Sequence, residues 1–205
     1  MTLTCAAPAA FPAPESREAA LADLEHSVTE RRAEAVAWIA NHGSLADQPL
    51  LVRRLRDESA FVRGFAEQGL WLLWSRSGDA GIDRQMARGV EEMQSGRLAQ
   101  ALATFSDVIR RRPDFAEAWN KRATTHYLAG NFRESMADCD EVLRRNPEHF
   151  GALSGYGQIH FQLDEYEKAL RWWKRALEVN PNMVGIEINI RMTEERLRQK
   201  RGRPI

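Results

Sequence analysis

The stretch EVLRRNPEHFGALSGYG, Glu141 to Gly157, decides the fold of this chain. An arginine-rich stretch of helical character runs into Asn146 and Pro147, and an apolar pattern resumes directly behind them. Because proline cannot donate to the helix ladder and restricts the residue before it, the sequence predicts that one helix ends here and another begins at once. The same interruption occurs at Pro113 and Pro181, which are equally distant in sequence from Pro147 (147 − 113 = 34 and 181 − 147 = 34).

Five further rows of residues keep this 34-residue step, and the members of each row share a size or a turn-forming character. The rows are Gly89, Ala123 and Gly157; Gly96, Gly130 and Asp164; Leu98, Phe132 and Tyr166; Ala101, Ser135 and Ala169; and Phe105, Cys139 and Trp173. Self-similarity at one fixed period indicates a repeat array. No single unit can bury its apolar face alone, so neighbouring units must stack and share a core.

The middle unit predicts two antiparallel helices. The first runs from about Glu117 to Ala129 and the second from about Phe132 to Arg145, with a turn at Gly130 and Asn131 between them. Glycine and asparagine accept the left-handed backbone angles that such a turn requires. Small side chains at Ala123 and Ser135 let the two helices approach closely. We expect three larger residues to fill the space around that contact: Trp119, Phe132 and Val142.

This pattern resembles the tetratricopeptide repeat (TPR). The first unit carries Gly89, Gly96, Leu98, Ala101, Phe105 and Pro113 of the family pattern. The middle unit carries Trp119, Ala123, Gly130, Phe132, Cys139 and Pro147, and the third Tyr156, Gly157, Tyr166, Ala169, Trp173, Ala176 and Pro181. The departures are Arg122 in place of Leu, Gln85 and Leu153 in place of Trp, and His126 and His160 in place of Tyr. The resemblance covers about half of the chain and implies an all-α solenoid of antiparallel helix pairs.

Two stretches upstream of the repeats also predict helices. In the second stretch Ser59 can cap a helix, and the apolar residues behind it are Phe61, Val62, Phe65, Leu70, Leu73 and Trp74. The spacing of Asp57, Val62 and Arg63 resembles a HEAT repeat, in which such an Asp and Arg bond between neighbouring turns. The first stretch repeats part of the second, with Arg32, Ala35 and Ile39 matching Arg63, Ala66 and Leu70.

We therefore expect four segments along the chain. They are a flexible leader or remnant of an export signal (1–17), a HEAT-like helical region (18–81), three TPR units (82–183, divided as 82–115, 116–149 and 150–183), and a capping helix with a basic tail (184–205). The capping helix is indicated by Ile186, Ile190 and Leu197 at helical spacing. The cations of the tail, from Arg196 to Arg203, complement a helix C-terminus, and contact with anionic lipid or nucleic acid is the alternative.

The resemblance also implies a partner, because TPR domains bind a peptide or a partner helix along the concave face of their first helices. Positions of that face fall on Asp83, Met86, Val90 and Met93 in the first unit, on Asn120, Lys121, Thr124 and Tyr127 in the second, and on Ser154, Gln158, Phe161 and Gln162 in the third. This face is neutral and mixed, which suits an extended peptide. TPR domains that hold a chaperone tail through a carboxylate clamp need two Lys, two Asn and an Arg here. Met86, Val90, Gly151 and Gly155 stand in those places, so that activity is disfavoured.

Composition narrows the function further. The chain has 205 residues and a hydrophobic content of 43%, enough for a substantial core. Its 29 basic and 29 acidic residues balance, which argues against a nucleic-acid binder with a basic face. Cys5 and Cys139 do not form a disulfide framework, and Cys139 is expected to be a buried core residue. No metal-ligand cluster, cofactor motif or catalytic motif appears, since His126 and His160 are expected to be core histidines.

The leader MTLTCAAPAAFPAPESR leaves the compartment open. It lacks the early positive charge and the apolar core of a secretory signal, yet it is rich in the small residues that end one. Modification of Cys5 by lipid is a weak possibility, because Thr2 stands where the motif needs Leu. The protein is expected in the periplasm if an export signal precedes or includes the leader, and in the cytoplasm otherwise.

Together these observations predict a noncatalytic bacterial protein–protein interaction module, an adaptor or assembly scaffold, that is a monomer or a weak homo-oligomer. The alternative is a noncatalytic regulatory subunit held at an envelope enzyme or at a membrane surface by its leader or tail.

Overall fold

The structure is a computed structural model that describes residues 12–201. Within these residues all regular secondary structure is helical, with eleven α-helices, one short 3₁₀ turn and no strand. The chain divides into two compact units between Arg76 and Ser77, here called unit 1 and unit 2. The predicted all-α class is confirmed. Most of the leader (residues 1–11, with Cys5) and the end of the basic tail (202–205) lie outside the described residues.

Unit 1 contains two helix pairs, and the second pair repeats the first. The elements are α1 (Arg17–Asp23), α2 (Thr29–His42), the 3₁₀ turn η1 (Leu45–Asp47), α3 (Gln48–Arg54) and α4 (Ala60–Ser75). The short helices α1 and α3 have equal length, and the starts of both helices recur at one step (48 − 17 = 31 and 60 − 29 = 31). Buried aliphatic side chains of α2, α3 and α4, among them Ile39, Leu51 and Leu70, form the core.

The two long helices, α2 and α4, also begin with the same contact, made by arginines 31 residues apart. Nη1 of Arg32 donates to the carbonyl oxygens of His26 and Ser27, at 2.8 and 3.1 Å. Nη1 of Arg63 donates to the carbonyl oxygens of Asp57 and Glu58, at 2.9 and 3.1 Å. Each arginine therefore closes the loop that leads into its own helix, and the match between Arg32 and Arg63 expected from the sequence reflects one shared contact.

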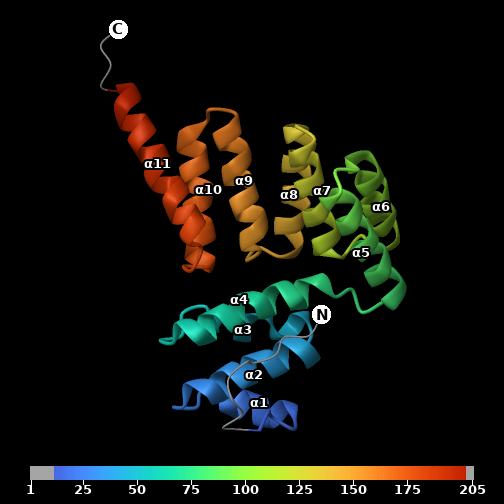
Figure 1. The fold of residues 1–205 in the computed structure, drawn as a ribbon, viewed down its shortest axis with the longest axis vertical. Helices are drawn as coiled ribbons and strands as arrows, with labels where there is room; N and C mark the ends of the chain where they lie inside the picture. The colour runs from blue at the N-terminus through green and yellow to red at the C-terminus, as the bar shows by residue number, and fades with distance from the viewer. Residues whose placement is uncertain (1–11, 202–205) are drawn as a thin grey trace. The chain divides into compact units, whose positions relative to one another are not determined.

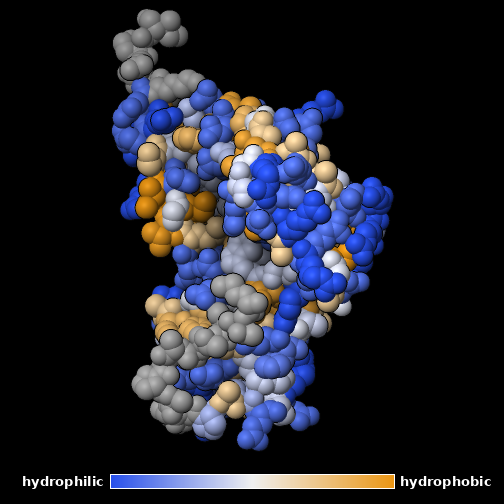
Figure 2. All heavy atoms as spheres, turned by 45° about the vertical axis from the view of Figure 1, so that its right-hand side comes forward, coloured by the Kyte–Doolittle hydropathy of each residue, from blue (hydrophilic) through white to orange (hydrophobic). Residues whose placement is uncertain are grey.

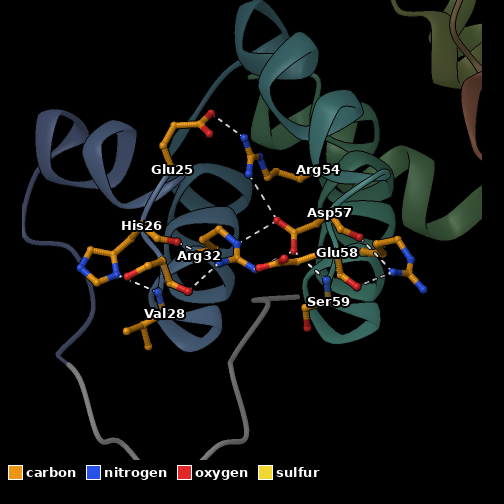
Figure 3. Close-up of polar contacts among 10 residues, drawn as sticks. Glu25, His26, Val28, Arg32, Arg54, Asp57, Glu58 and Ser59 are labelled. Atoms are coloured by element: carbon orange, nitrogen blue, oxygen red, sulfur yellow. Dashed lines mark hydrogen bonds and ion pairs between the residues drawn. The ribbon is translucent and has the colours of Figure 1, made fainter.

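A buried ion pair links the two helix pairs of unit 1 (Figure 3). Nε and Nη2 of Arg32 donate to the two carboxylate oxygens of Asp57, both at 2.9 Å. Asp57 also accepts from the backbone N–H of Ser59 at 2.9 Å and from Arg54 at 3.3 Å. Burial alone would raise the pKa of Asp57, but the bonds from Arg32 and Ser59 outweigh it, so this pKa lies below its ordinary value. A charge pair with this many hydrogen bonds is tolerated in the interior.

Two details differ from the sequence-based expectation for α4. Ser59 is the N-cap residue of α4, but its side chain makes no capping hydrogen bond. The carboxylate of Asp57, two residues earlier, receives the Ser59 N–H instead. Phe61 is 41% exposed and not a core residue, whereas Val62, Phe65, Leu70, Leu73 and Trp74 are buried as expected.

Unit 2 is a row of antiparallel helix pairs followed by one more helix (Figure 1). The pairs are α5 (Ala80–Gln94) with α6 (Leu98–Arg111), α7 (Ala116–Leu128) with α8 (Phe132–Arg145), and α9 (Phe150–Gln162) with α10 (Tyr166–Val179), and the last helix is α11 (Val184–Arg201). The turn within each pair contains the residue expected from the 34-residue step. Gly96, Gly130 and Asp164 have φ of 74°, 78° and 58°, the left-handed region that glycine, and less often aspartate, adopts.

The close approach within each pair depends on small residues that face large ones. A Cβ added at Gly157 would lie 2.2 Å from Cδ1 of Trp173, and one added at Gly89 would lie 2.6 Å from Cε1 of Phe105. In the middle pair the large residue is replaced by Cys139, and Ala123 takes the place of glycine. At this position of the repeat, a glycine therefore occurs where an aromatic ring of the second helix needs its space.

The middle pair has one further hydrogen bond between its helices, and one of its residues lies elsewhere than predicted. The hydroxyl of Ser135 donates to the carbonyl oxygen of Ala123 at 2.7 Å, as expected for a close contact. Val142 is fully buried. Trp119, however, packs against the core cluster of the first pair. Its indole donates to the carbonyl of Pro113, and the guanidinium groups of Arg122 and Arg145 lie 5.0 and 4.7 Å from its ring centroid.

α11 covers the open end of the third pair, as expected for a capping helix. Ile190 is buried against Ala169 and Trp173, with Ile186 packed beside them. Arg196 lies over the ring of Phe161, 5.4 Å from its centroid. None of the helices in the described range has both the length and the apolar character that crossing a bilayer requires.

Candidate functional site

Unit 2 contains a pocket of about 130 Å³ between α7 and α9. Both helices are the first members of their pairs, the face along which the sequence placed the candidate groove. The pocket is lined by Asn120, Ala123, Thr124 and Tyr127 of α7, by Ser135 and Cys139 of α8, and by Gly151, Ala152, Gly155, Gln158 and Ile159 of α9.

The pocket is open because two residues of its wall are glycines, which have no side chain. Gly151 and Gly155 stand one helical turn apart on α9 and leave its wall bare. A Cβ added at Gly155 would meet only Sγ of Cys139, at an ordinary contact distance of 3.8 Å. Unlike Gly89 and Gly157, Gly155 is therefore not required by helix packing, and the space beside it is available to another molecule.

Cys139 forms the floor of the pocket and is 3% exposed. Burial, together with the nearby carboxylates of Asp138 and Asp140, raises the pKa of its thiol to about 12. The thiol is therefore protonated at neutral pH, and a protonated thiol is a weak nucleophile. Cys139 acts here as a soft apolar surface.

A buried polar cluster supports the α7 wall. The carboxylate of Glu117 accepts from Nδ2 of Asn120 at 3.0 Å and from Nζ of Lys121 at 2.9 Å. It also lies 3.1 Å from Nε2 of His149. Because Nδ1 of His149 accepts the backbone N–H of Ala152, Nε2 carries the ring hydrogen and donates to Glu117. Burial tends to raise the pKa of Glu117, but the bond from His149 and the charge of Lys121 outweigh it and hold this pKa below its ordinary value.

This cluster has a consequence for the charge of the face. Lys121 is ion-paired with the Glu117 carboxylate, and Asn120 is 7% exposed with its amide directed to the same group. Asn120 therefore lines the pocket with its amide turned to Glu117, and the charge of Lys121, which is not a lining residue, is paired. The polar groups of the rim are uncharged: Thr124 donates its hydroxyl hydrogen to the carbonyl of Asn120, and Gln162 donates to the hydroxyl of Tyr127 across α7 and α9.

The pocket gathers four of the residues that the sequence placed in the groove, namely Asn120, Thr124, Tyr127 and Gln158. The others lie elsewhere. Met86 is 6% exposed in the core of the first pair, and Val90 and Met93 pack against the same cluster. The Ser154 hydroxyl donates to the carbonyl of Gly151, and Phe161 packs beside Trp173. Lys121 and Gln162 are held by the partners described above.

The floor and the bare wall were not predicted as part of the site. Ser135 and Cys139 were assigned to the core, and Gly151 and Gly155 were noted only as missing cations. The signal that could have found them is the glycine pair itself, because two glycines one turn apart on a helix have a cost of roughly 0.5–1 kcal/mol each that some function must offset.

His126 and His160 hold separate contacts. Nδ1 of His160 lies 2.6 Å from the carboxylate of Glu165, and Nδ1 of His126 lies 3.5 Å from the amide of Asn131. Burial lowers the pKa of His126. Across the part of the chain that the structure describes, no group of three or more His, Cys, Asp or Glu side chains could hold a metal ion.

Comparison with known proteins gives the family of unit 2. Two tetratricopeptide repeat models match residues 86–142 and 150–183. A TPR repeat-containing protein of Rhizobium etli is 35% identical over 126 residues, which make up 62% of this chain. The matched segment spans 62% of the length of that relative.

Solved TPR structures share the fold at low sequence identity. The first TPR of Spaghetti (RPAP3), bound to the HSP90 peptide SRMEEVD, is 21% identical with a TM-score of 0.54, over 57% of this chain and 92% of that one. The Sgt2 TPR domain from Aspergillus fumigatus is 17% identical with a TM-score of 0.57, over 62% and 87%. The TPR2B domain of yeast Sti1, in complex with pHsp70, is 20% identical with a TM-score of 0.54, over 58% and 99%. The repeat models match residues 86–142 and 150–183, and the helix pairs stack at the 34-residue step, so this part of the chain consists of tetratricopeptide repeats.

Proposed function

We propose that unit 2 binds an extended peptide segment of a partner protein across α7 and α9, and that the protein is a noncatalytic adaptor or assembly scaffold. The observation that carries this proposal is the pocket beside Gly155, whose space no side chain of the fold requires. At about 130 Å³ it is smaller than a typical small-molecule site and suits one aliphatic side chain of a bound peptide.

Two similar folds support a peptide as the ligand. The Spaghetti domain is bound to an HSP90 peptide and the Sti1 domain is in complex with pHsp70. The peptide SRMEEVD carries two glutamates and an aspartate. The pocket described here presents glycines and neutral polar groups, and its nearest lysine, Lys121, is ion-paired with Glu117. We therefore expect a partner segment that is uncharged at its centre and places an aliphatic side chain in the pocket.

Selection from a random peptide library displayed on phage, with the full chain as bait, tests the proposal. The affinity of the best synthetic peptide is then measured by fluorescence anisotropy for the wild type and for Gly155→Leu, in which a side chain fills the pocket. We expect an affinity loss of at least about tenfold, which corresponds to one lost apolar anchor.

Gly64→Leu is the matched control, because a Cβ at Gly64 would meet no atom within 4 Å and Gly64 belongs to unit 1. Gln158→Ala, on the rim of the pocket, should weaken binding by a smaller factor. Equal affinity of the wild type and Gly155→Leu, with both variants folded by circular dichroism, would refute the proposed pocket.

A further inference from the structure

The capping helix α11 has an exposed apolar stripe on the side that does not pack on α10. Val184, Ile188 and Met192 are 62%, 43% and 56% exposed, and they follow each other at every fourth position of the helix. Ile190, which packs against Ala169 and Trp173, lies on the other side of the helix. Figure 2 shows hydrophobic residues gathered on the surface near the N-terminal half of α11.

This stripe is unusual for the last helix of an array. A terminal helix normally presents a polar outer face, which keeps the array soluble. Here Ile188 and Met192 stand one repeat step after Ser154 and Gln158 (188 − 154 = 34 and 192 − 158 = 34), so the row changes from polar to apolar side chains at the end of the array. A row of exposed apolar residues in a helix indicates a surface that another helix covers.

We infer that the stripe is covered by α11 of a second copy of this chain, in an antiparallel pair related by a two-fold axis. The axis passes level with Asn189. With a rise of about 1.5 Å per residue, the six apolar side chains of the two copies then follow one another at intervals of about 3 Å along the pair. Met192 of one copy fits between Ile188 and Val184 of the other, so the two stripes interdigitate.

Charge complementarity selects this register. Glu187 and Arg191 are both exposed and flank the same edge of the stripe, one turn apart. An axis level with Asn189 places Glu187 of one copy level with Arg191 of the second copy, and the symmetry repeats this pairing at the other end. A two-fold interface is self-complementary in this way, because each contact occurs twice.

The size of the surface predicts the strength of the pair. Three apolar residues and two ionic contacts for each copy form an interface smaller than those of stable complexes. We therefore expect a weak dimer that dissociates in the high-micromolar range.

Sedimentation equilibrium of the full chain, from micromolar to near-millimolar concentration, tests this inference. Glu187→Arg alone and Arg191→Glu alone should each weaken the dimer by at least about tenfold, because each places like charges across the pair. The double variant Glu187→Arg with Arg191→Glu should restore the wild-type affinity. Ile188→Lys should leave only monomer.

The matched controls are Glu167→Arg and Arg171→Glu, which reverse an exposed pair of the same kind and spacing on α10. They should leave the dimer unchanged, and circular dichroism should show all variants folded. A wild-type chain that stays monomeric throughout, or a dimer that the α11 charge reversals do not weaken, would overturn the inference. A chain that stays monomeric while its α11 variants lose a selected peptide would assign the stripe to a peptide partner instead.

Discussion

Unit 1 and unit 2 are both stacks of helix pairs, yet they hold neighbouring helices together by different means. In unit 1, where the step between pairs is the shorter one, a buried arginine on one pair binds a buried aspartate at the start of the next long helix. In unit 2, where the step is longer, the closest contacts within two of the pairs depend on volume, since glycine faces tryptophan at Gly157 and phenylalanine at Gly89. A buried polar contact occurs here too, between Glu117 of α7 and His149 at the start of α9.

The two kinds of contact are broken by different kinds of substitution. A buried ion pair is lost when one charge is removed, because the remaining charge is left in the interior without its partner. A contact between glycine and an aromatic ring carries no charge, and it is lost when one carbon atom is added. Substitutions in the two units should therefore respond to different chemistry, although the secondary structure is the same.

The largest effect is expected for Asp57→Ala in unit 1. This change leaves the buried Arg32 without a buried carboxylate and removes the group that receives the Ser59 N–H. We expect a loss of about 3–5 kcal/mol in the free energy of unfolding of unit 1, measured by urea titration followed through tryptophan fluorescence. Glu58→Ala is the control, because the Glu58 side chain is 82% exposed although it also binds Arg32. Similar losses for the two variants would show that burial of the pair is not what matters.

Gly157→Ala in unit 2 should have the next largest effect. The added carbon would lie 2.2 Å from the Trp173 ring, so the ring or the helix must move. Overpacking of this kind has a cost of about 1–3 kcal/mol. The melting temperature should fall, and the near-ultraviolet circular dichroism of the tryptophans should change. An unaltered melting temperature would mean that the α9–α10 contact is not close-packed.

Acid should weaken unit 1 through Asp57. The pKa of this carboxyl is lower in the folded protein than its ordinary value, so its contribution is present above that value and is lost as the pH falls through the folded pKa. The stability of the wild type should therefore decrease between about pH 5 and pH 3. Asp57→Asn should show a shallower decrease in the same urea titrations, whereas an equal slope in both proteins would place the acid sensitivity elsewhere.

The smallest effect, and one of opposite sign, is expected for Gly155→Ala. This residue is on the same helix as Gly157 and two residues before it, but its added carbon would meet only Cys139 at 3.8 Å. Replacing a helical glycine by alanine then stabilises by about 0.5–1 kcal/mol. A small rise in the melting temperature would confirm that packing does not require glycine here, and a fall would mean that the pocket wall is closer to α8 than the structure shows.

Much of the repeat array could be predicted from the sequence, because the residues that recur every 34 positions have local structural roles. Pro147 follows the end of α8, because a proline inside a helix removes a backbone hydrogen bond. Gly130 and Asp164 stand where the backbone takes a positive φ. These requirements are local, so their regular spacing predicts the helix pairs of unit 2 without knowledge of the contacts. In unit 1 the equivalence of α1 and α3 was missed, since two turns of helix carry too little periodicity to be recognised.

Side-chain direction explains what the sequence could not predict. Asp57 and Arg63 were named as HEAT-like residues, a type that bonds between neighbouring turns. The Asp57 carboxylate receives Arg32 of the preceding helix pair, and the Asp57 backbone carbonyl receives Arg63. The HEAT-like assignment itself stays a prediction. Asn120 lines the pocket, but its amide, which was expected to face a partner, donates to the Glu117 carboxylate instead. The pocket was missed because it is made by absent side chains, which a search for functional groups does not register.

A nuclear magnetic resonance titration of the ¹⁵N-labelled full chain with the selected peptide tests peptide binding between α7 and α9 most directly. We predict that the backbone amides of Thr124, Gly155 and Gln158 shift in proportion to occupancy, while those of α10 stay in place. Shifts that concentrate on α10 or in unit 1, with none at Gly155, would contradict the proposed site.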